Sequence, residues 1–323
     1  MRVLITGITG MVGSHLADYI LAHHPSTEIH GLVRWRSPID NIRHIQSRVV
    51  LHHAELRDLN SLVLLLASVR PDRIFHLAAQ SYVSSSFSAP ADTIHTNVIG
   101  TTNLLDAVRI SQIHPRVHIC SSSEVYGQVT EDELPIRETN PFRPASPYAV
   151  SKVGEDLIGL QYFLSYGLMT LRTRMFTHTG PRRGDVFAES AFARQIAEIE
   201  AGVRPNPMKV GNLHSVRTFA DVRDAVRAYW LLLEKCPAGE VYNIGGERTM
   251  TIGEMLDMLK SMARCKIEHE VDPDLLRPSD VTLQIPDTSK FRAATGWRPQ
   301  IPLEDTLRDL LDYQRDRVRQ QAS

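Results

Sequence analysis

Cysteine is scarce in this chain: its 323 residues include only three, Cys120, Cys236 and Cys265, and none of them stand in CxxC spacing. Disulfide-framed domains and cysteine-based zinc sites both need more cysteines at closer spacing. The sequence therefore excludes a disulfide scaffold, predicts no metal site and is typical of a protein from a reducing compartment.

Long apolar runs and an excess of charge are missing as well. No stretch approaches the roughly 20 apolar residues that a membrane-spanning helix needs. We also expect no secretory leader before the first apolar segment. Lys and Arg number 36 against 37 Asp and Glu, which argues against nucleic acid or an acidic membrane as the main partner. We expect a soluble, cytoplasmic protein without a nucleic-acid or membrane partner.

Apolar segments of strand length alternate with amphipathic segments of helix length over the first part of the chain. This alternation predicts an α/β fold of the Rossmann type, a doubly wound parallel sheet with helices on both faces. We expect strands at 3–6, 29–33, 49–53, 73–77, 117–121 and 169–174, and helices at 14–22, 59–69, 97–110 and 147–163.

The texture changes after residue 176, where loops and proline-broken stretches separate shorter elements. We predict a dinucleotide-binding domain at 1–175 and a smaller α/β substrate-binding domain at 176–323. Helices are expected at 192–202, 221–233, 252–263 and 303–318, and the helix at 221–233 is expected to pack back onto the first domain.

Glycines crowd the turn between the first strand and the first helix, in Thr6-Gly7-Ile8-Thr9-Gly10-Met11-Val12-Gly13. Residues without a Cβ let the backbone approach a pyrophosphate, which then sits at the positive end of the helix. The alternative is an ordinary flexible turn, but the position between strand and helix favours a dinucleotide site. Gly7, Gly10, Met11, Val12 and Gly13 are the candidate contacts.

The end of the second strand carries basic residues where an acidic one would favour NAD. Arg34, Arg36 and Ser37 stand there, and two guanidinium groups with a hydroxyl suit the 2′-phosphate of NADP. A solvated basic loop is the alternative. Because the glycine turn specifies this position, we predict NADP as the cofactor.

Tyr148 and Lys152 are four residues apart at the start of a predicted helix, so their side chains share one face. A phenol with a pKa of about 10 is a poor base at neutral pH. A neighbouring ammonium, together with the charge of a nicotinamide, stabilises the phenolate. The fifth strand ends in Ser122 and Glu124 nearby, at the edge where parallel sheets bind ligands.

Together, the glycine turn and the Tyr-x-x-x-Lys pair resemble the extended short-chain dehydrogenase/reductases, which act on nucleotide sugars. Further segments resemble GDP-mannose 4,6-dehydratases, with GDP-4-keto-6-deoxymannose reductases a close second through residues 210–222. These segments are His76-Leu-Ala-Ala-Gln80-Ser81, Ser122-Ser-Glu124-Val-Tyr-Gly127, Ser146-Pro-Tyr148-Ala-Val-Ser-Lys152, Pro181-Arg-Arg-Gly184 and Arg277-Pro-Ser-Asp280-Val.

The resemblance implies a redox-neutral loss of water from GDP-mannose. In that family the tyrosine, here Tyr148, takes the C4 hydroxyl proton while hydride passes to NADP+. A carboxylate, here Glu124, removes the C5 proton, water leaves from C6, and the hydride returns to C6. Ser122 matches a hydroxyl bonded to the C4 oxygen, and Lys152 is the electrostatic partner of Tyr148.

Further contacts are implied only by the resemblance. Cofactor contacts fall on Glu55, Leu56, Leu77, Ala78 and Ala79, besides Tyr148 and Lys152. Arg182 and Arg183 match a loop that contacts cofactor between subunits. Substrate contacts fall on Ser81, Thr177, Lys209, Asn212, Arg217, Arg277 and Asp280.

The sequence departs from the family pattern at Thr177, Thr218 and Glu55, where relatives have Asn, Asp and Asp. The Thr177 change leaves the sugar open, and the nucleotide base is open as well. A 4-reductase, a 4-epimerase or dehydratase of another nucleotide sugar, and a non-catalytic nucleotide-binding protein are the alternatives. Relatives pair through two long helices, so we expect a homodimer or homotetramer formed through 97–110 and 147–163.

Overall fold

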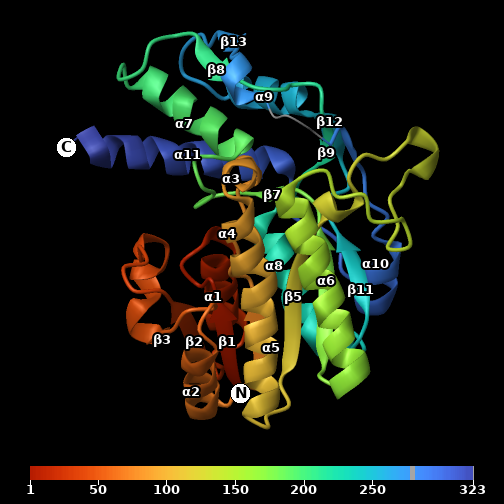
Figure 1. Cartoon of the computed structure of the whole chain (residues 1–323). Coiled ribbons are helices and arrows are strands. Elements are labelled where there is room, and N and C mark those ends of the chain that lie inside the picture. The colour runs from red at the N-terminus through yellow and green to blue at the C-terminus, as the bar shows by residue number, and fades with distance from the viewer. Residues whose placement is uncertain (277–280, 323) are drawn as a thin grey trace.

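A parallel sheet of seven strands forms the centre of the computed structural model, which describes residues 1–276 and 281–322 (Figure 1). Arg277 and Asp280 therefore lie outside the described residues. The strand order is β11-β6-β5-β4-β1-β2-β3, and every pairing in this sheet is parallel. The strands are β1 (Arg2–Thr6), β2 (Glu28–Val33), β3 (Val50–His53), β4 (Arg73–His76), β5 (Arg116–Ser122), β6 (Thr170–Met175) and β11 (Val241–Ile244).

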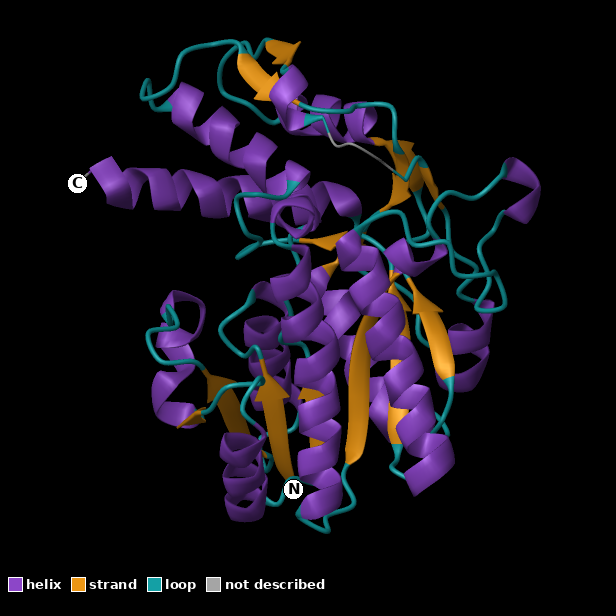
Figure 2. Cartoon of the chain, viewed as in Figure 1, coloured by secondary structure: helices purple, strands orange, loops and turns teal. Residues whose placement is uncertain are grey.

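Both faces of the sheet are buried, as alternate residues of β1 demonstrate. Val3 and Ile5 pack in one cluster with α1 (Met11–His23) and α8 (Val222–Lys235). Leu4 packs in the other with α2 (Leu59–Val69) and α5 (Gly100–Ile110). Because side chains alternate along a strand, helices on both faces require strands that are apolar at every position. The predicted doubly wound α/β fold is confirmed (Figure 2).

The segment before α5 contains more elements than the single helix expected at 97–110. Two short helices, α3 (Val83–Ser88) and α4 (Pro90–Ile94), lead into a π-helical turn, His95–Ile99, and then into α5. Next to α5 lies α6 (Pro147–Tyr166). The Ser146 hydroxyl accepts a hydrogen bond from the Ala149 N–H at its start, and Gly167, at φ 69°, ends it in the left-handed region.

The part of the chain after residue 176 lies over the carboxyl ends of the strands (Figure 1). Its apolar cluster is built by α7 (Ala188–Glu200), α9 (Ile252–Ser261) and α11 (Leu303–Ala322). Small sheets complete it: β7 (His178–Thr179) with β10 (Ala220–Asp221), β8 (Met208–Val210) with β13 (His269–Val271), and β12 (Thr249–Thr251), β9 (Val216–Thr218) and β14 (Leu283–Gln284).

Two elements from this later part return to the main sheet. The helix α8 packs against α1, and β11 pairs with β6 at the sheet edge. A short helix, α10 (Ser289–Thr295), lies against β11. None of the helices in the described ranges is long and apolar enough to cross a membrane.

Two histidines are buried inside the sheet layer without charged acidic partners among the groups that shift them. His76 is 2% exposed and His118 0%. The pKa of each is lowered to about 3, chiefly by burial; the Lys152 ammonium acts in the same direction on both, and His76 also lowers the pKa of His118. The unfolded chain therefore binds these protons more tightly than the folded chain, so stability falls as the pH drops from about 6.5 toward 3.

Replacing His118 by Gln is expected to flatten this acid limb. Each depressed histidine adds a slope of up to about 1.4 kcal/mol per pH unit to the free energy of unfolding between the two pKa values. Urea unfolding of wild type and His118→Gln from pH 4.5 to 6.5 measures the difference. The exposed His114→Gln variant is the control and should follow the wild-type slope. Equal slopes for all three proteins would contradict the buried neutral state of His118.

Candidate active site

A cavity of about 1120 Å³ runs from the glycine turn, across the carboxyl ends of the strands, to the later part of the chain. Cavities that hold one small ligand are usually about 300–1,000 Å³, so this one has room for two ligands together. The predicted residues among its lining are Gly7, Gly10, Met11, Val12, Gly13, Arg34, Glu55, Leu56, Leu77, Ala78, Ala79, Ser81, Ser122, Glu124, Tyr148, Lys152, Thr177, Lys209, Asn212 and Arg217.

The glycine turn is shaped so tightly that side chains are excluded from it. Gly7 has φ +72°, and a Cβ on Gly13 would lie 2.2 Å from the Gly7 carbonyl oxygen. Gly10 precedes the first residue of α1 and brings no capping side chain, while its own N–H donates to Gly7 O at 3.0 Å. A helix start lined by bare backbone suits a pyrophosphate, so these residues fit a dinucleotide.

Gly13→Ala is expected to weaken dinucleotide binding, because the added methyl must displace the Gly7 carbonyl and reshape the turn. We expect the dissociation constant for NADP, measured by fluorescence or calorimetric titration, to rise at least tenfold, which is a loss of about 1.4 kcal/mol of binding free energy. Gly253→Ala in α9 is the control, since the nearest atom to its Cβ is 3.4 Å away. Wild-type affinity in Gly13→Ala would contradict the assignment of this turn.

The end of β2 divides the predicted basic residues. Arg34 and Ser37 both line the cavity, and the Arg34 N–H donates to Ser37 Oγ at 3.1 Å. Arg36 has φ +66°, is exposed, and lies outside the described lining, in a turn closed by a hydrogen bond from Ser37 N to Arg34 O. Asn41, which the sequence analysis missed, also lines this end and donates to Thr9 O at 2.9 Å.

The four candidate catalytic residues come from three elements, β5, the short helix η3 (Ser123–Tyr126) and α6. Tyr148 and Lys152 occupy the first turns of α6, and Ser122 ends β5. Glu124 lies in η3, and its N–H donates to Ser122 Oγ at 3.2 Å. The structure thus brings all four to one wall of the cavity, as the strand-end argument predicts.

Burial and charge act on Tyr148 in opposite directions. The side chain is 8% exposed, and burial raises the pKa of its phenol, while the Lys152 ammonium and a hydrogen bond with Ser122 lower it. Lys152 Nζ lies 5.8 Å from the Tyr148 ring centre. Because burial outweighs both, the phenol by itself stays protonated at neutral pH. A second positive charge in the cavity is needed to bring it into range, as the sequence analysis assumed.

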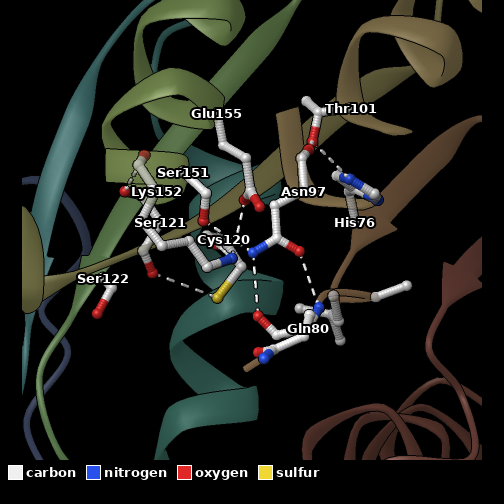
Figure 3. A network of polar contacts seen from close by, with 12 residues as sticks. His76, Gln80, Asn97, Thr101, Cys120, Ser121, Ser122, Ser151, Lys152 and Glu155 are labelled. Atoms are coloured by element: carbon white, nitrogen blue, oxygen red, sulfur yellow. Dashed lines mark hydrogen bonds and ion pairs between the residues drawn. The ribbon is translucent and has the colours of Figure 1, made fainter. Parts of the chain in front are cut away.

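Polar contacts behind the cavity wall fix the glycine turn and the β4 loop to each other (Figure 3). His76 shares hydrogen bonds with Thr6 Oγ1 at 2.8 Å and Thr101 Oγ1 at 2.9 Å. Asn97, in the π-helical turn, accepts from Gln80 N at 2.8 Å and donates to Ser151 Oγ at 2.9 Å. This network holds the backbone of the cavity wall and was not predicted. The sequence signal that could have indicated it is an asparagine inside an expected helix, since a polar side chain there needs hydrogen-bond partners if it is buried.

On the opposite side, the later part of the chain contributes polar and basic side chains. Arg217 is 8% exposed and its guanidinium donates to the carbonyls of Val216 and Val281. Asn212 donates to Ser215 Oγ at 3.0 Å, and Lys209 pairs with Glu270 at the rim. Arg217, Asn212 and Lys209 all line the cavity, so they supply positive charge and polar groups where a diphosphate would need them.

The two arginines of the Arg182-Arg183 loop both contact residues of the same chain. Arg182 pairs with Asp18 at 2.7 Å, and the Arg183 guanidinium lies 3.6 Å from the centre of the Phe187 ring. Both arginines line the cavity. Burial lowers the pKa of Arg183, which is close enough to Tyr148 for the two charges to interact.

The fold, the glycine turn and the Tyr-Lys pair together define an enzyme of the short-chain dehydrogenase/reductase class. The chain belongs to the GDP-mannose 4,6 dehydratase family, whose sequence profile matches residues 4–310. This confirms the predicted resemblance.

Relatives in this family carry two activities. The chain is 34% identical over 320 residues to the GDP-6-deoxy-D-mannose reductase of Pseudomonas aeruginosa, covering 99% of both chains. It is 32% identical to the GDP-mannose 4,6-dehydratase of Yersinia enterocolitica, covering 99% of this chain and 95% of that one.

Solved structures agree on the fold. RMD from Pseudomonas aeruginosa, complexed with NADPH, superposes with a TM-score of 0.86 at 34% identity and covers 98% of this chain and 99% of its own. DesIV, a dTDP-glucose 4,6-dehydratase from Streptomyces venezuelae with NAD and TYD bound, has a TM-score of 0.84 at 29% identity, with 98% and 97% covered.

Proposed function

We propose that the chain converts GDP-mannose to GDP-4-keto-6-deoxymannose, as an NADP-dependent hydro-lyase. Residues 1–175 hold the dinucleotide and residues 176–323 the nucleotide sugar. The observation that carries the proposal is that Glu124 lines the same cavity as Tyr148 and Ser122 and sits two residues from Ser122. Loss of water needs a base for the C5 proton, whereas reduction at C4 alone does not.

The residues divide the proton transfers between them. Tyr148 takes the proton from the sugar's C4 hydroxyl, and Ser122 holds the C4 oxygen. Lys152 stabilises the phenolate through its charge. Glu124 removes the C5 proton and gives it to the hydroxyl that leaves from C6 as water. C5 takes up a proton from solvent when C6 is reduced, and the proton held by Tyr148 is released to solvent, so that the net change is the loss of one water. NADP, when bound, supplies the acceptor and donor of hydride.

The cofactor assignment rests on the end of β2 and on a relative. Arg34 and Ser37 line the cavity where a 2′-phosphate would bind, and no acidic residue stands between positions 31 and 37. The reductase structure from Pseudomonas aeruginosa is a complex with NADPH. We infer the same cofactor here, with Arg36 in a solvent-facing role.

For the substrate, the basic side chains of the opposite wall are the candidates. Arg217, with Asn212 and Lys209, would receive the nucleoside diphosphate, and Thr177 and Ser81 would lie nearer the sugar. Arg277 and Asp280 are proposed from the sequence alone.

A homodimer or homotetramer is proposed through α5 and α6. Large apolar side chains are exposed along this pair of helices and its π-helical turn, which is unusual for a surface that faces water alone. They are Ile99, Ile110, Val150, Leu157, Leu164 and Tyr166, between 40% and 70% exposed.

A 4-reductase of GDP-4-keto-6-deoxymannose is the second candidate. The match to the Pseudomonas aeruginosa reductase spans 320 residues and 99% of both chains. The match to the Yersinia enterocolitica dehydratase extends over 361 positions, more than this chain contains, so that relative carries inserted segments. Overall length therefore favours the reductase, and Glu124 favours the dehydratase.

One assay separates the two candidates. Purified protein is incubated with GDP-mannose and a trace of NADP+, and the sugar is followed by proton NMR. A new C6 methyl signal, formed in many-fold excess over cofactor, supports dehydration. No change with GDP-mannose, but stoichiometric consumption of NADPH with the 4-keto-6-deoxy sugar, would replace the dehydratase proposal by the reductase.

A further inference from the structure

A buried carboxylate stands directly behind the Tyr148–Lys152 pair. Glu155, one helical turn after Lys152 in α6, is 1% exposed. Its Oε2 accepts a hydrogen bond from Lys152 Nζ at 2.8 Å (Figure 3). Glu155 is not part of the described cavity lining, whereas Lys152 is, so the ammonium bridges the cavity and the carboxylate.

The ammonium is held by two acceptors. Lys152 Nζ also donates to Cys120 O of β5 at 3.0 Å. An ammonium has three N–H donors, so two are taken by acceptors in the described part of the chain. The other Glu155 oxygen, Oε1, is buried and has no hydrogen-bond partner among the described residues. Its carboxylate is therefore matched chiefly by one cation.

Few other charges compete for this pair. Asp156 already pairs with Arg172 and Arg174, each at 2.8 Å. Asp92 of α4 pairs with Arg57. The other titratable groups on the described elements packed against α6 are Glu124 and Tyr126 of η3, His95 of the π-helical turn, Asp106 and Arg109 of α5, which pair with each other, Arg116, His118 and Cys120 of β5, and Tyr148, Tyr162 and Tyr166 of α6 itself. The Lys152 charge also acts on His76 of β4.

We propose that Glu155 is a positioning residue, which holds the Lys152 ammonium and sets how strongly its charge stabilises the Tyr148 phenolate. The inference rests on the proposed role of Tyr148 as the proton acceptor. An ionised Glu155 offsets the field of Lys152 at the phenol, so the tyrosine becomes acidic only when a further positive charge enters the cavity. Such an arrangement keeps the base protonated until the site is loaded.

Two properties of the site agree with this role. Among the charges that act on Tyr148, Lys152 lowers the pKa of the phenol and Glu155 raises it. Burial raises the pKa of Glu155 itself to about 7, against the lowering effect of Lys152. For Lys152, burial lowers the pKa, but Glu155 and Tyr148 outweigh it and raise it overall.

Glu155→Gln tests the proposal, because the amide oxygen can still accept from Lys152 while the negative charge is gone. Protein labelled with ¹³C at tyrosine Cζ reports phenolate formation by NMR without cofactor or substrate. Tyr148→Phe identifies the Tyr148 signal among the nine tyrosines. We expect the Tyr148 midpoint to move to lower pH in Glu155→Gln. Asp106→Asn, which removes a carboxylate paired with Arg109, is the charge-matched control and should leave it unmoved.

The pH dependence of turnover gives a second readout. If Tyr148 is the base, the acid limb of the kcat profile moves to lower pH by the same amount in Glu155→Gln. At a fixed pH on that limb, the rate rises about tenfold for each pH unit by which the limb moves. Glu155→Asp, which withdraws the charge by one methylene, should move both readouts in the same direction but less, and it serves if the glutamine variant does not fold.

The two proposals fail separately. A Tyr148 midpoint that is the same in wild type, Glu155→Gln and Glu155→Asp, or an unmoved acid limb in an active enzyme, overturns the role of Glu155. A clear change of the NMR midpoint in a protein that turns over no nucleotide sugar overturns the proposed function and leaves the coupling intact.

Discussion

Tyr148→Phe is expected to lower kcat by about 10²–10⁴-fold, the usual contribution of one general base. The phenylalanine keeps the ring in its 8% exposed position but removes the only atom that can take the C4 hydroxyl proton from this side chain. Stability should change little, because the variant deletes one hydroxyl at a cavity wall. Steady-state kinetics with GDP-mannose measures the loss, and a cofactor titration should return the wild-type dissociation constant.

The matched control is Tyr166→Phe on the same helix. Tyr166 ends α6, is 54% exposed and does not line the described cavity. Its variant should keep wild-type kinetics. If Tyr148→Phe also kept them, the proton would leave by another route and the assignment of the base would be wrong.

Glu124→Gln is expected to stop the loss of water by about 10²–10⁴-fold, since the amide has no basic oxygen for the C5 proton. Proton exchange at C5 offers a direct measure: wild type in deuterated water should place deuterium there, and the variant should not. Oxidation at C4 does not need this carboxylate, so reduced cofactor should accumulate to the level of the enzyme, visible by absorbance at 340 nm.

Glu131→Gln provides the comparison, because Glu131 is exposed in the short helix η4 (Glu131–Glu133) and outside the described cavity lining. It should behave as wild type. Undiminished dehydration by Glu124→Gln would remove Glu124 from the mechanism and require another base for the C5 proton.

Most of the sheet could be predicted because its signals are local. A strand buried on both faces needs an unbroken apolar run, and β1 has one. The glycine turn follows directly, so the strand and the dinucleotide motif can both be recognised within the first thirteen residues. The shared face of Tyr148 and Lys152 could be predicted from the helical period alone. The helix itself, α6, is marked in the sequence by its caps, Ser146 and Gly167. The resemblance then supplied roles that residue spacing alone leaves open.

What escaped prediction depends on contacts between distant residues. The strand β11 was missed because its four residues form a strand only through pairing with β6, which lies about seventy positions earlier in the chain. Sequence proximity also does not reveal that Arg36 has a positive φ and lies outside the described cavity lining that includes Arg34. The helix expected at 192–202 begins at Ala188, with Phe187 before it and no side-chain cap to mark the start.

Glu155 shows the same limit inside a correctly predicted helix. An acid three residues after a lysine normally indicates a solvated ion pair on a helix surface. Only the packing of α6 against β5 and β6 reveals that both side chains are buried, at 6% and 2% side-chain exposure. Because the Lys152–Glu155 pair is buried, it is not a solvated surface ion pair, and its charges act on the neighbouring Tyr148 phenol.

The most direct measurement follows deuterium placed at C4 of GDP-mannose. If Tyr148, Lys152, Ser122 and Glu124 carry out a redox-neutral dehydration in one cavity, the label reappears on the C6 methyl of the 4-keto-6-deoxy product of the same turnover. NMR and mass spectrometry should find it there with trace NADP+ present. Product without the label at C6, or no product from GDP-mannose at all, would contradict the proposed reaction.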